Sequence, residues 1–209
     1  MKIGIIAANG KAGSLITEEA VNRGLNVTAI VRNANKTVAP QSLIKDIFEL
    51  TTDDLTQFDV VVNAFGEFRE EKLHLHQDVM QYLSDLLSHS KTRLLVVGGA
   101  GSLFVDDHLK TQLYDTPDFP AMFKPLATSQ GKALDELRQR DDVRWTFISP
   151  AAEFNADGER TGDYTLAGEK FTLNSKGEST ISYADYAIAL IDEATSGDHI
   201  QERISVVSK

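Results

Sequence analysis

The first 33 residues constrain the fold more than any other stretch of the chain. They begin with a short apolar run, MKIGIIA, and continue through a polar, glycine-containing stretch, ANGKAG. Apolar residues then recur at helical spacing over 14–23, Gly24 ends that segment, and a β-branched run follows at 25–31. This order predicts a strand, a glycine turn, a helix and a second strand, which is the βαβ unit that opens a parallel sheet.

The glycine turn has the composition of a dinucleotide-binding site. The pyrophosphate of a dinucleotide rests against a helix N-terminus, where backbone N–H groups have no intrahelical partner. Gly10 and Gly13 match the last two glycines of the spacing G-x-x-G-x-x-G, and Ala7 stands where the first would be. Glycines there let the phosphates approach and let the helix pack closely on the strand. The predicted phosphate-binding residues are Ala8, Asn9, Gly10, Lys11, Ala12 and Gly13.

The end of the second strand indicates which cofactor is bound. An acidic residue there would suit the ribose hydroxyls of NAD, whereas a basic residue suits the 2′-phosphate of NADP. Arg32 and Asn33 occupy this place, so we expect NADP(H) in preference to NAD(H). The alternative is that Arg32 is an ordinary solvated charge at a strand end. Asp46, after the next apolar run, lies either near the adenine, as in related folds, or in a simple turn.

Composition limits the remaining possibilities. The chain of 209 residues suits one domain, and its 42% hydrophobic content is typical of a soluble globular protein. It contains no cysteine, which excludes disulfides, cysteine–metal sites and thiol catalysis. The net charge of −10 argues against a surface for nucleic acid. We see no signal peptide and no apolar run long enough for a membrane span, so we expect a cytoplasmic protein that does not bind membranes.

The rest of the chain continues the alternation of strands and helices. Strands are expected at 43–48, 58–66, 93–102, 142–148 and 204–207, and helices at 70–90, 126–140 and 183–195. We therefore predict an α/β doubly wound parallel sheet, the Rossmann fold, as a single domain over 1–209. Residues 150–180, with a hairpin or paired extended segments around 174–177, are expected to form a small substrate-side cap in the C-terminal part of the chain.

The ends of the inner strands are the expected ligand edge. In a doubly wound sheet, ligands bind beyond the carboxyl ends of the strands where the strand order reverses, here between the first and fourth strands. Ala64, Phe65 and Gly66 end the fourth strand, and Gly98 and Gly99 lie at the exit of the fifth. Small residues there would admit the cofactor and Phe65 would cover it, although a simple strand-to-loop exit explains Phe65 equally well.

Two histidines on the helix at 70–90 raise the question of a metal site. His74 and His76 are two residues apart, so on a helix their side chains point in different directions. We therefore predict exposed helix histidines and no metal site.

Several stretches together carry a family resemblance: GIIAANGKAGSLI, AIVRN, DVVVNAFG, LLVVGGAGS, RWTFISPA and the late Ser182-x-x-Asp185-x-Ala187. In this order they resemble the atypical short-chain dehydrogenases, and within them the NmrA-like, NAD(P)H-binding proteins that include flavin and biliverdin reductases. The resemblance covers nearly the whole chain. It implies a Rossmann protein that reduces a planar acceptor, acts as an isomerase or epimerase, or only senses the nucleotide.

The resemblance also implies candidate catalytic residues. Short-chain dehydrogenases often carry a substrate-orienting serine after the fifth strand, and Ser102 is the candidate, with a plain turn serine as the alternative. The wider superfamily uses Tyr-x-x-x-Lys, in which the lysine lowers the pKa of the proton-donating phenol. Lys132 matches the lysine, but Thr128 stands at the tyrosine and is too weak an acid. Lys132 then either binds the nicotinamide ribose or is simply solvated.

Two classes of function follow from these residues. The first is an NADPH-dependent reductase of a flavin, quinone or similar small molecule, since such acceptors need no strong protein acid. The second is a regulatory protein that binds NADP(H) without turnover, and a relative of sugar-nucleotide epimerases or dehydratases is a further alternative. The sequence does not choose between a monomer and a homodimer.

Overall fold

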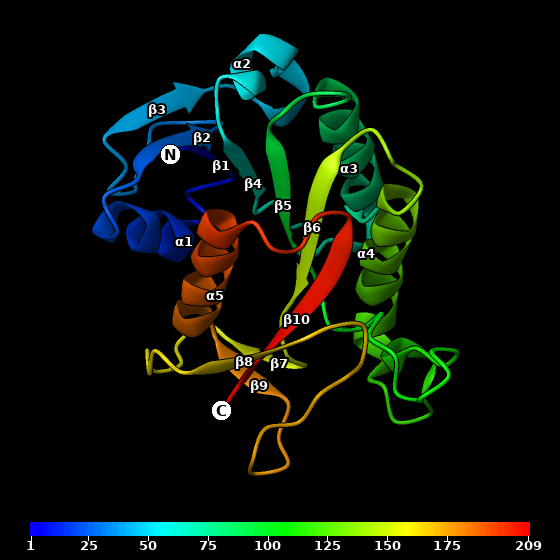
Figure 1. The fold of residues 1–209 in the computed structure, drawn as a ribbon. Coiled ribbons are helices and arrows are strands. Elements are labelled where there is room, and N and C mark those ends of the chain that lie inside the picture. Colours follow the sequence, from blue (N-terminus) through cyan, green and yellow to red (C-terminus); the bar gives the residue numbers. More distant parts are fainter.

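The computed structural model describes all 209 residues and is built on one large sheet. Its eight strands lie in the order β3-β2-β1-β4-β5-β6-β10-β8. All neighbouring pairs are parallel except β10 and β8, which are antiparallel. Helices cover both faces of the sheet (Figure 1). The predicted doubly wound, Rossmann-like α/β fold is thereby confirmed.

The elements have the following bounds. The main sheet contains β1 (Lys2–Ile6), β2 (Asn26–Val31), β3 (Gln41–Ile44), β4 (Val60–Asn63), β5 (Arg93–Val97), β6 (Arg144–Ser149), β8 (Tyr164–Ala167) and β10 (Glu202–Ser208). A separate pair contains β7 (Glu153–Asn155) and β9 (Thr180–Ser182). The helices are α1 (Lys11–Asn22), α2 (Thr52–Thr56), α3 (Leu75–Leu86), α4 (Lys124–Leu137) and α5 (Tyr183–Ser196).

A hydrophobic core lies on each face of the sheet. In β4, Val60 and Val62 belong to the core beneath α1 and α5, and Val61 belongs to the core beneath α3 and α4. A strand that is buried on both faces must be apolar at every position, which explains the continuous apolar run at this place in the sequence.

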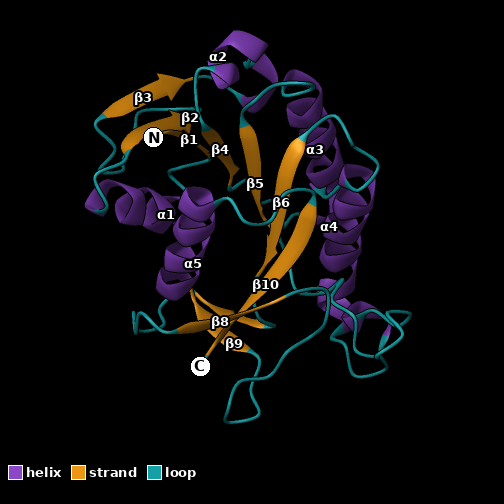
Figure 2. Ribbon diagram, viewed as in Figure 1, coloured by secondary structure: helices purple, strands orange, loops and turns teal.

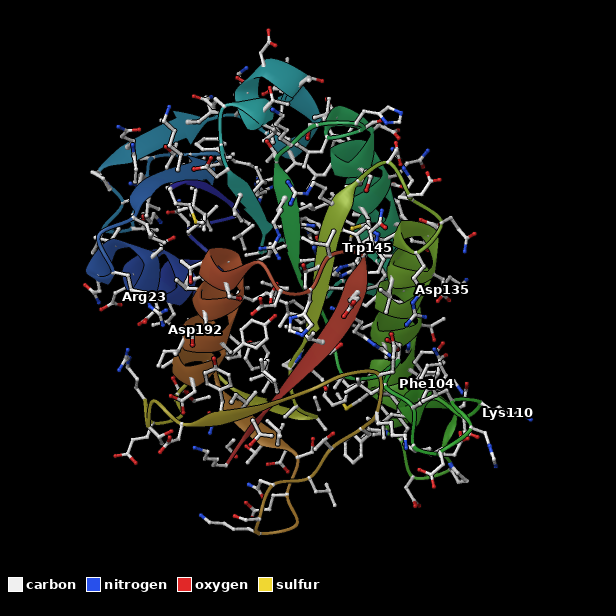
Figure 3. All side chains as sticks on the ribbon, viewed as in Figure 1. Arg23, Phe104, Lys110, Asp135, Trp145 and Asp192 are labelled. Carbon is white, nitrogen blue, oxygen red and sulfur yellow. The ribbon has the colours of Figure 1, made fainter.

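The helices α1 and α5 pack side by side although they are far apart in the chain. Arg23, at the end of α1, forms an ion pair with Asp192 of α5 and a second one with Glu19 of its own helix. Figure 3 shows Arg23 and Asp192 between the two helices. The ion pair between Arg23 and Asp192 is partly exposed to solvent and therefore adds little stability. The buried apolar residues between the two helices hold them together.

Hydroxyl side chains cap the N-termini of two helices. The Thr51 hydroxyl accepts a hydrogen bond from the backbone N–H of Asp54 at the start of α2 (3.3 Å). The Ser182 hydroxyl does the same for Asp185 at the start of α5 (3.0 Å). Both caps stabilise the start of a helix, because a hydroxyl oxygen satisfies a helix N–H that has no partner within the helix.

Two sequence predictions of local structure were wrong. The third strand ends at Ile44, and Ile47–Glu49 forms a 3₁₀ turn instead of continuing it. A turn does form around 174–177, where Gly177 has a positive φ of 80°. Its arms do not pair as a hairpin, however, because β9 pairs in parallel with β7. The antiparallel strand β8, next to β10, was not expected.

The segment 150–180 lies where β6 and β10 end. It contains β7 and β8, and with β9 these strands lie at the lower edge of the molecule in Figure 2. The loop at 161–162 is held there by Asp185, whose carboxylate accepts hydrogen bonds from the N–H groups of Thr161 (2.9 Å) and Gly162 (2.8 Å). No helix in the structure has the length and apolar character needed to cross a membrane.

Candidate functional site

The turn between β1 and α1 presents an open helix N-terminus. Gly10 is the N-cap residue of α1, and no side chain caps this helix. The first backbone hydrogen bond of the helix runs from the N–H of Ser14 to the carbonyl of Gly10 (2.8 Å). The N–H groups before Ser14 therefore have no intrahelical partner, and they form the kind of terminus that binds phosphate.

The two glycines of this turn meet different requirements. A Cβ atom on Gly13 would lie 2.5 Å from the carbonyl oxygen of Ala7 and 3.0 Å from the Cα of Ala8, so α1 could not pack against the end of β1. A Cβ atom on Gly10 would meet only the Ala7 oxygen, at 3.2 Å. Gly10 is exposed and leaves the turn open, whereas Gly13 is buried and lets the helix approach.

Ala7, at the place of the missing first glycine, has the backbone conformation that a glycine would adopt. Its φ is +57°, in the left-handed region that L-residues other than glycine rarely occupy. Holding an alanine there costs about 1–2 kcal/mol. The departure from the motif therefore changes the residue but preserves the shape of the turn.

Asn9 connects the phosphate turn to the loop after β2. Its side-chain amide donates to the carbonyl of Ala34 (3.0 Å), and its side-chain oxygen accepts from the N–H of Lys36 (2.8 Å). The side chain thus positions the loop that follows Arg32 beside the turn. This contact could not be predicted from sequence, because the partners lie 25 and 27 residues away.

The residues expected to select the cofactor lie close to this turn. Arg32 and Asn33 directly follow β2, which pairs with β1, and both are exposed. The Asp46 carboxylate accepts from the N–H of Phe48 (3.1 Å), and the N–H of Asp46 donates to Glu49 (3.2 Å). Asp46 therefore caps a 3₁₀ turn, as the turn interpretation predicted, and an adenine contact stays a prediction.

The end of β4 is held against the same turn. Since β1 lies between β2 and β4, the strand order reverses there, as predicted. The N–H of Ala64 donates to the carbonyl of Ile6 (3.2 Å), and the buried Asn63 side chain accepts from the N–H of Phe65 (3.1 Å). Ala64, Phe65 and Gly66 are thereby brought beside the open end of α1.

A small hollow lies next to these strand ends, on the face covered by α3 and α4. The side chains around it are mostly apolar, with three polar ones from three different elements. The lining residues are Asn63, Phe65, His76, Met80, Val96, Val97, Gly98, Gln130, Ala133 and Phe147.

His76 is part of this hollow and is buried, so the prediction of exposed histidines was wrong for this residue. It packs edge-to-face on Phe65, with 5.6 Å between the ring centroids. Its Nε2 donates to the carbonyl oxygen of Glu67 (2.9 Å), which assigns the ring proton to Nε2 because a carbonyl can only accept. Burial lowers the pKa of His76, so the ring is neutral at pH 7. His74, in contrast, is exposed as predicted.

The glycines after β5 make room for side chains of the protein itself. The Phe147 ring fills the space beside Gly98, and the side-chain amide of Gln130 fills the space beside Gly99. Gly98 is therefore required for packing against a rigid ring. The neighbour of Gly99 is the end of a flexible side chain, which can move when a ligand arrives. Cofactor contacts at both glycines stay predictions.

The two catalytic candidates lie in different places. Ser102 is buried, and its hydroxyl accepts from Nη1 of the buried Arg203 (2.9 Å), whose guanidinium also pairs with Glu169. Lys132 is exposed and lines a separate groove, together with Thr128, between the start of α3 and the N-terminal half of α4. The structure brings neither Ser102 nor Lys132 into the hollow, and their catalytic roles stay predictions.

Gln130 does reach the hollow, and sequence reasoning missed it. The signal was present, because Gln130 lies three residues before Ala133 and four before Leu134, on the inward stripe of the predicted helix. A glutamine on that stripe is a polar residue among inward-facing apolar ones.

The comparisons with known proteins agree with this geometry. The NAD(P)H-binding family matches residues 7–195 of the chain. The uncharacterised protein YwnB of Bacillus subtilis is 52% identical over the whole chain and 99% of its own length. The crystal structure of SP1627 from Streptococcus pneumoniae, described as a candidate NADH-flavin reductase, has a TM-score of 0.98 and 56% identity over the full length of both chains. The anaerobilin reductase ChuY of Escherichia coli shares the fold, with a TM-score of 0.70 and 16% identity over 100% of this chain and 97% of its own.

Proposed function

This chain belongs to the NAD(P)H-binding family, and on that premise we propose that it is an NADPH-dependent oxidoreductase that reduces a flavin, quinone or similar planar acceptor. The bound cofactor would supply the hydride. The residues of the chain fit it, because the open N-terminus of α1 beside Gly10 suits a pyrophosphate and no side chain occupies that terminus. The description of SP1627 as a candidate NADH-flavin reductase supports the acceptor class.

The observation that carries the proposal is the hollow beside β4 and β5. Its single titratable side chain, His76, is neutral, and its proton is engaged by a backbone carbonyl. Most residues that line the hollow are apolar, and none of them is a strong proton donor. Flavins and quinones suit such a lining, because solvent can protonate them after hydride transfer, whereas ketone reduction requires an acid at the oxygen.

Arg32 supports the choice of NADPH over NADH. Its guanidinium is exposed, lies beside the phosphate turn and forms no ion pair within the protein. It is therefore free to bind a 2′-phosphate with charge-assisted hydrogen bonds. We further propose that 150–180 is a cap on the substrate side, since it follows the carboxyl end of β6.

A turnover assay tests the proposal. NADPH oxidation is followed at 340 nm with riboflavin, FMN, menadione and an aldehyde, and Gly10→Val serves as a variant that we expect not to bind the cofactor. We expect turnover with a flavin or quinone and none in the variant. Calorimetric binding of NADPH without turnover on any acceptor would instead identify a nucleotide-sensing protein, and absence of binding would refute both functions.

A further inference from the structure

The side-chain amide of Gln130 reaches the hollow, and the proposed function gives it no role. We propose that Gln130 contacts the acceptor and selects molecules that carry an N–H group next to a carbonyl, such as the imide edge of a flavin or the lactam edge of a bilin. This inference rests on the proposed reductase function and narrows its acceptor class, since quinones have no such edge.

The side-chain amide of Gln130 lies where a ligand can reach it. Gln130 extends from α4 over the backbone of Gly99, directly after β5, and lines the hollow together with Phe65. The side chain is partly exposed and has no hydrogen-bond partner within the protein. A packed glutamine usually satisfies its amide internally. An amide that is unpartnered at the wall of a hollow is therefore available to a ligand.

The side-chain amide of Gln130 can recognise a matching hydrogen-bonding edge on a ligand. A glutamine side chain presents a carbonyl acceptor and an N–H donor side by side. An imide or lactam edge presents the complementary pair, so it can form two hydrogen bonds in one plane, whereas a quinone carbonyl can form one. The flat ring of such an acceptor would pack on Phe65, which lines the same hollow and is partly exposed.

The carboxamide of the nicotinamide ring also presents an N–H group next to a carbonyl, so Gln130 has two possible partners, the cofactor and the acceptor. The phosphate turn leads into α1, which packs on the same core as α5. Gln130 and His76 lie on the opposite face of the sheet, on α4 and α3. The hollow thus lies on the far side of the strand ends from the helix expected to hold the phosphates, and this placement favours the acceptor.

The test compares the native protein with Gln130→Leu, which removes the amide and keeps a side chain of similar length. Gln139→Leu is the matched control, because Gln139 is exposed just beyond the end of α4. Steady-state kinetics with NADPH use lumiflavin and 3-methyllumiflavin, which lacks the imide N–H. The Kd of NADPH is measured by calorimetry for each protein.

We expect Gln130→Leu to raise the KM for lumiflavin by about 5- to 30-fold, the effect of one or two hydrogen bonds, with kcat changed less than about threefold. The native protein should prefer lumiflavin over its 3-methyl derivative, and the variant should lose that preference. The Kd of NADPH and the kinetics of Gln139→Leu should not change.

Three results would overturn the inference. An unchanged KM in Gln130→Leu, with native turnover intact, would refute it and leave the reductase proposal standing. A weaker NADPH affinity with an unchanged KM would assign the amide to the nicotinamide carboxamide. No native turnover with any flavin or quinone would refute the reductase function and this inference with it. If Gln130→Leu does not give a native melting curve, Gln130→Met replaces it in the same comparison.

Discussion

At the scale of single residues, we propose that the preference between the two nicotinamide cofactors depends on the guanidinium of Arg32. We predict that Arg32→Ala weakens NADPH binding by about 1–3 kcal/mol, the range of a lost charge-assisted hydrogen bond, and leaves NADH binding nearly unchanged. Calorimetric titration of both cofactors measures the effect. Arg144→Ala is the matched control. Arg144 is an exposed arginine at the start of β6, so it lies at the edge of the sheet away from the carboxyl ends of the strands. Equal affinity of the native protein for NADPH and NADH would contradict the role given to Arg32.

His76 gives the protein a pH-dependent stability of known sign. Burial lowers its pKa in the folded state below the value of about 6.5 that an unfolded histidine has. Between those two values the unfolded chain binds more protons, so the free energy of unfolding falls as pH decreases below about 6.5. The slope from this one group is at most about 1.4 kcal/mol per pH unit.

Urea unfolding at pH 7.5 and pH 5.5 measures this effect. We predict that the native protein loses more stability over this interval than His76→Gln does, because glutamine does not titrate. His74→Gln is the control and should behave like the native protein, since the His74 side chain is 63% exposed. The same pH dependence in the native protein and His76→Gln would show that other groups cause it.

At the scale of elements, the glycine turn before α1 separates packing from binding. We predict that Gly13→Ala destabilises the fold by about 1–3 kcal/mol, because its Cβ would lie 2.5 Å from the backbone oxygen of Ala7 and push α1 away from β1. Gly10→Val should keep the native circular dichroism spectrum and abolish NADPH binding, because it blocks the open helix N-terminus. Thermal melting and calorimetry of both variants test the two roles. A Gly10→Val protein that binds NADPH normally would place the phosphates elsewhere.

The elements that could be predicted from sequence are those with a local cause. The valines of β4 are apolar and buried, so this strand was predicted, although over 58–66, whereas it spans Val60–Asn63. α5 has a serine cap and apolar residues at helical spacing, and it was predicted close to its observed bounds. β8 was missed because it is short, largely exposed and stabilised by pairing with β10, which lies about 40 residues further on. The pairing of β9 with β7 is likewise non-local.

In the candidate site, too, the features with a local cause could be predicted and the non-local ones could not. Strand ends and the glycine turn could be located from sequence, because topology alone places them on one edge of the sheet. Contacts between distant segments could not be predicted. The bond from Arg203 to Ser102 joins residues 101 positions apart and holds the hydroxyl of a candidate catalytic residue in a buried network.

At the scale of the whole molecule, the sheet places the glycine turn and the hollow over opposite faces. The helix that begins at the phosphate turn lies over one core, and the helices that border the hollow lie over the other. The strand ends of β1 and β4, adjacent in the sheet, connect the two. A cofactor that crosses the edge at this point would reach from the open end of α1 to the strand ends that border the hollow, which is how ligands lie at a topological switch point.

The arrangement of the complete site leads to a final prediction about chemistry, namely that activity depends on hydride delivery without a protein acid. Thr128 and Lys132 face the outer groove and not the hollow. The phenol of Tyr114 packs against Gly131, and burial raises its pKa, which makes it a weaker acid. We expect a flavin or quinone to be reduced and simple ketones to be poor substrates. Thr128→Ala and Tyr114→Phe should each change the rate by less than about tenfold, because loss of a general acid costs 10²–10⁴-fold. Turnover of a quinone and a ketone by the native protein and both variants measures this, and a ketone reduced as fast as the quinone, or a collapse of the rate in either variant, would reveal a protein acid.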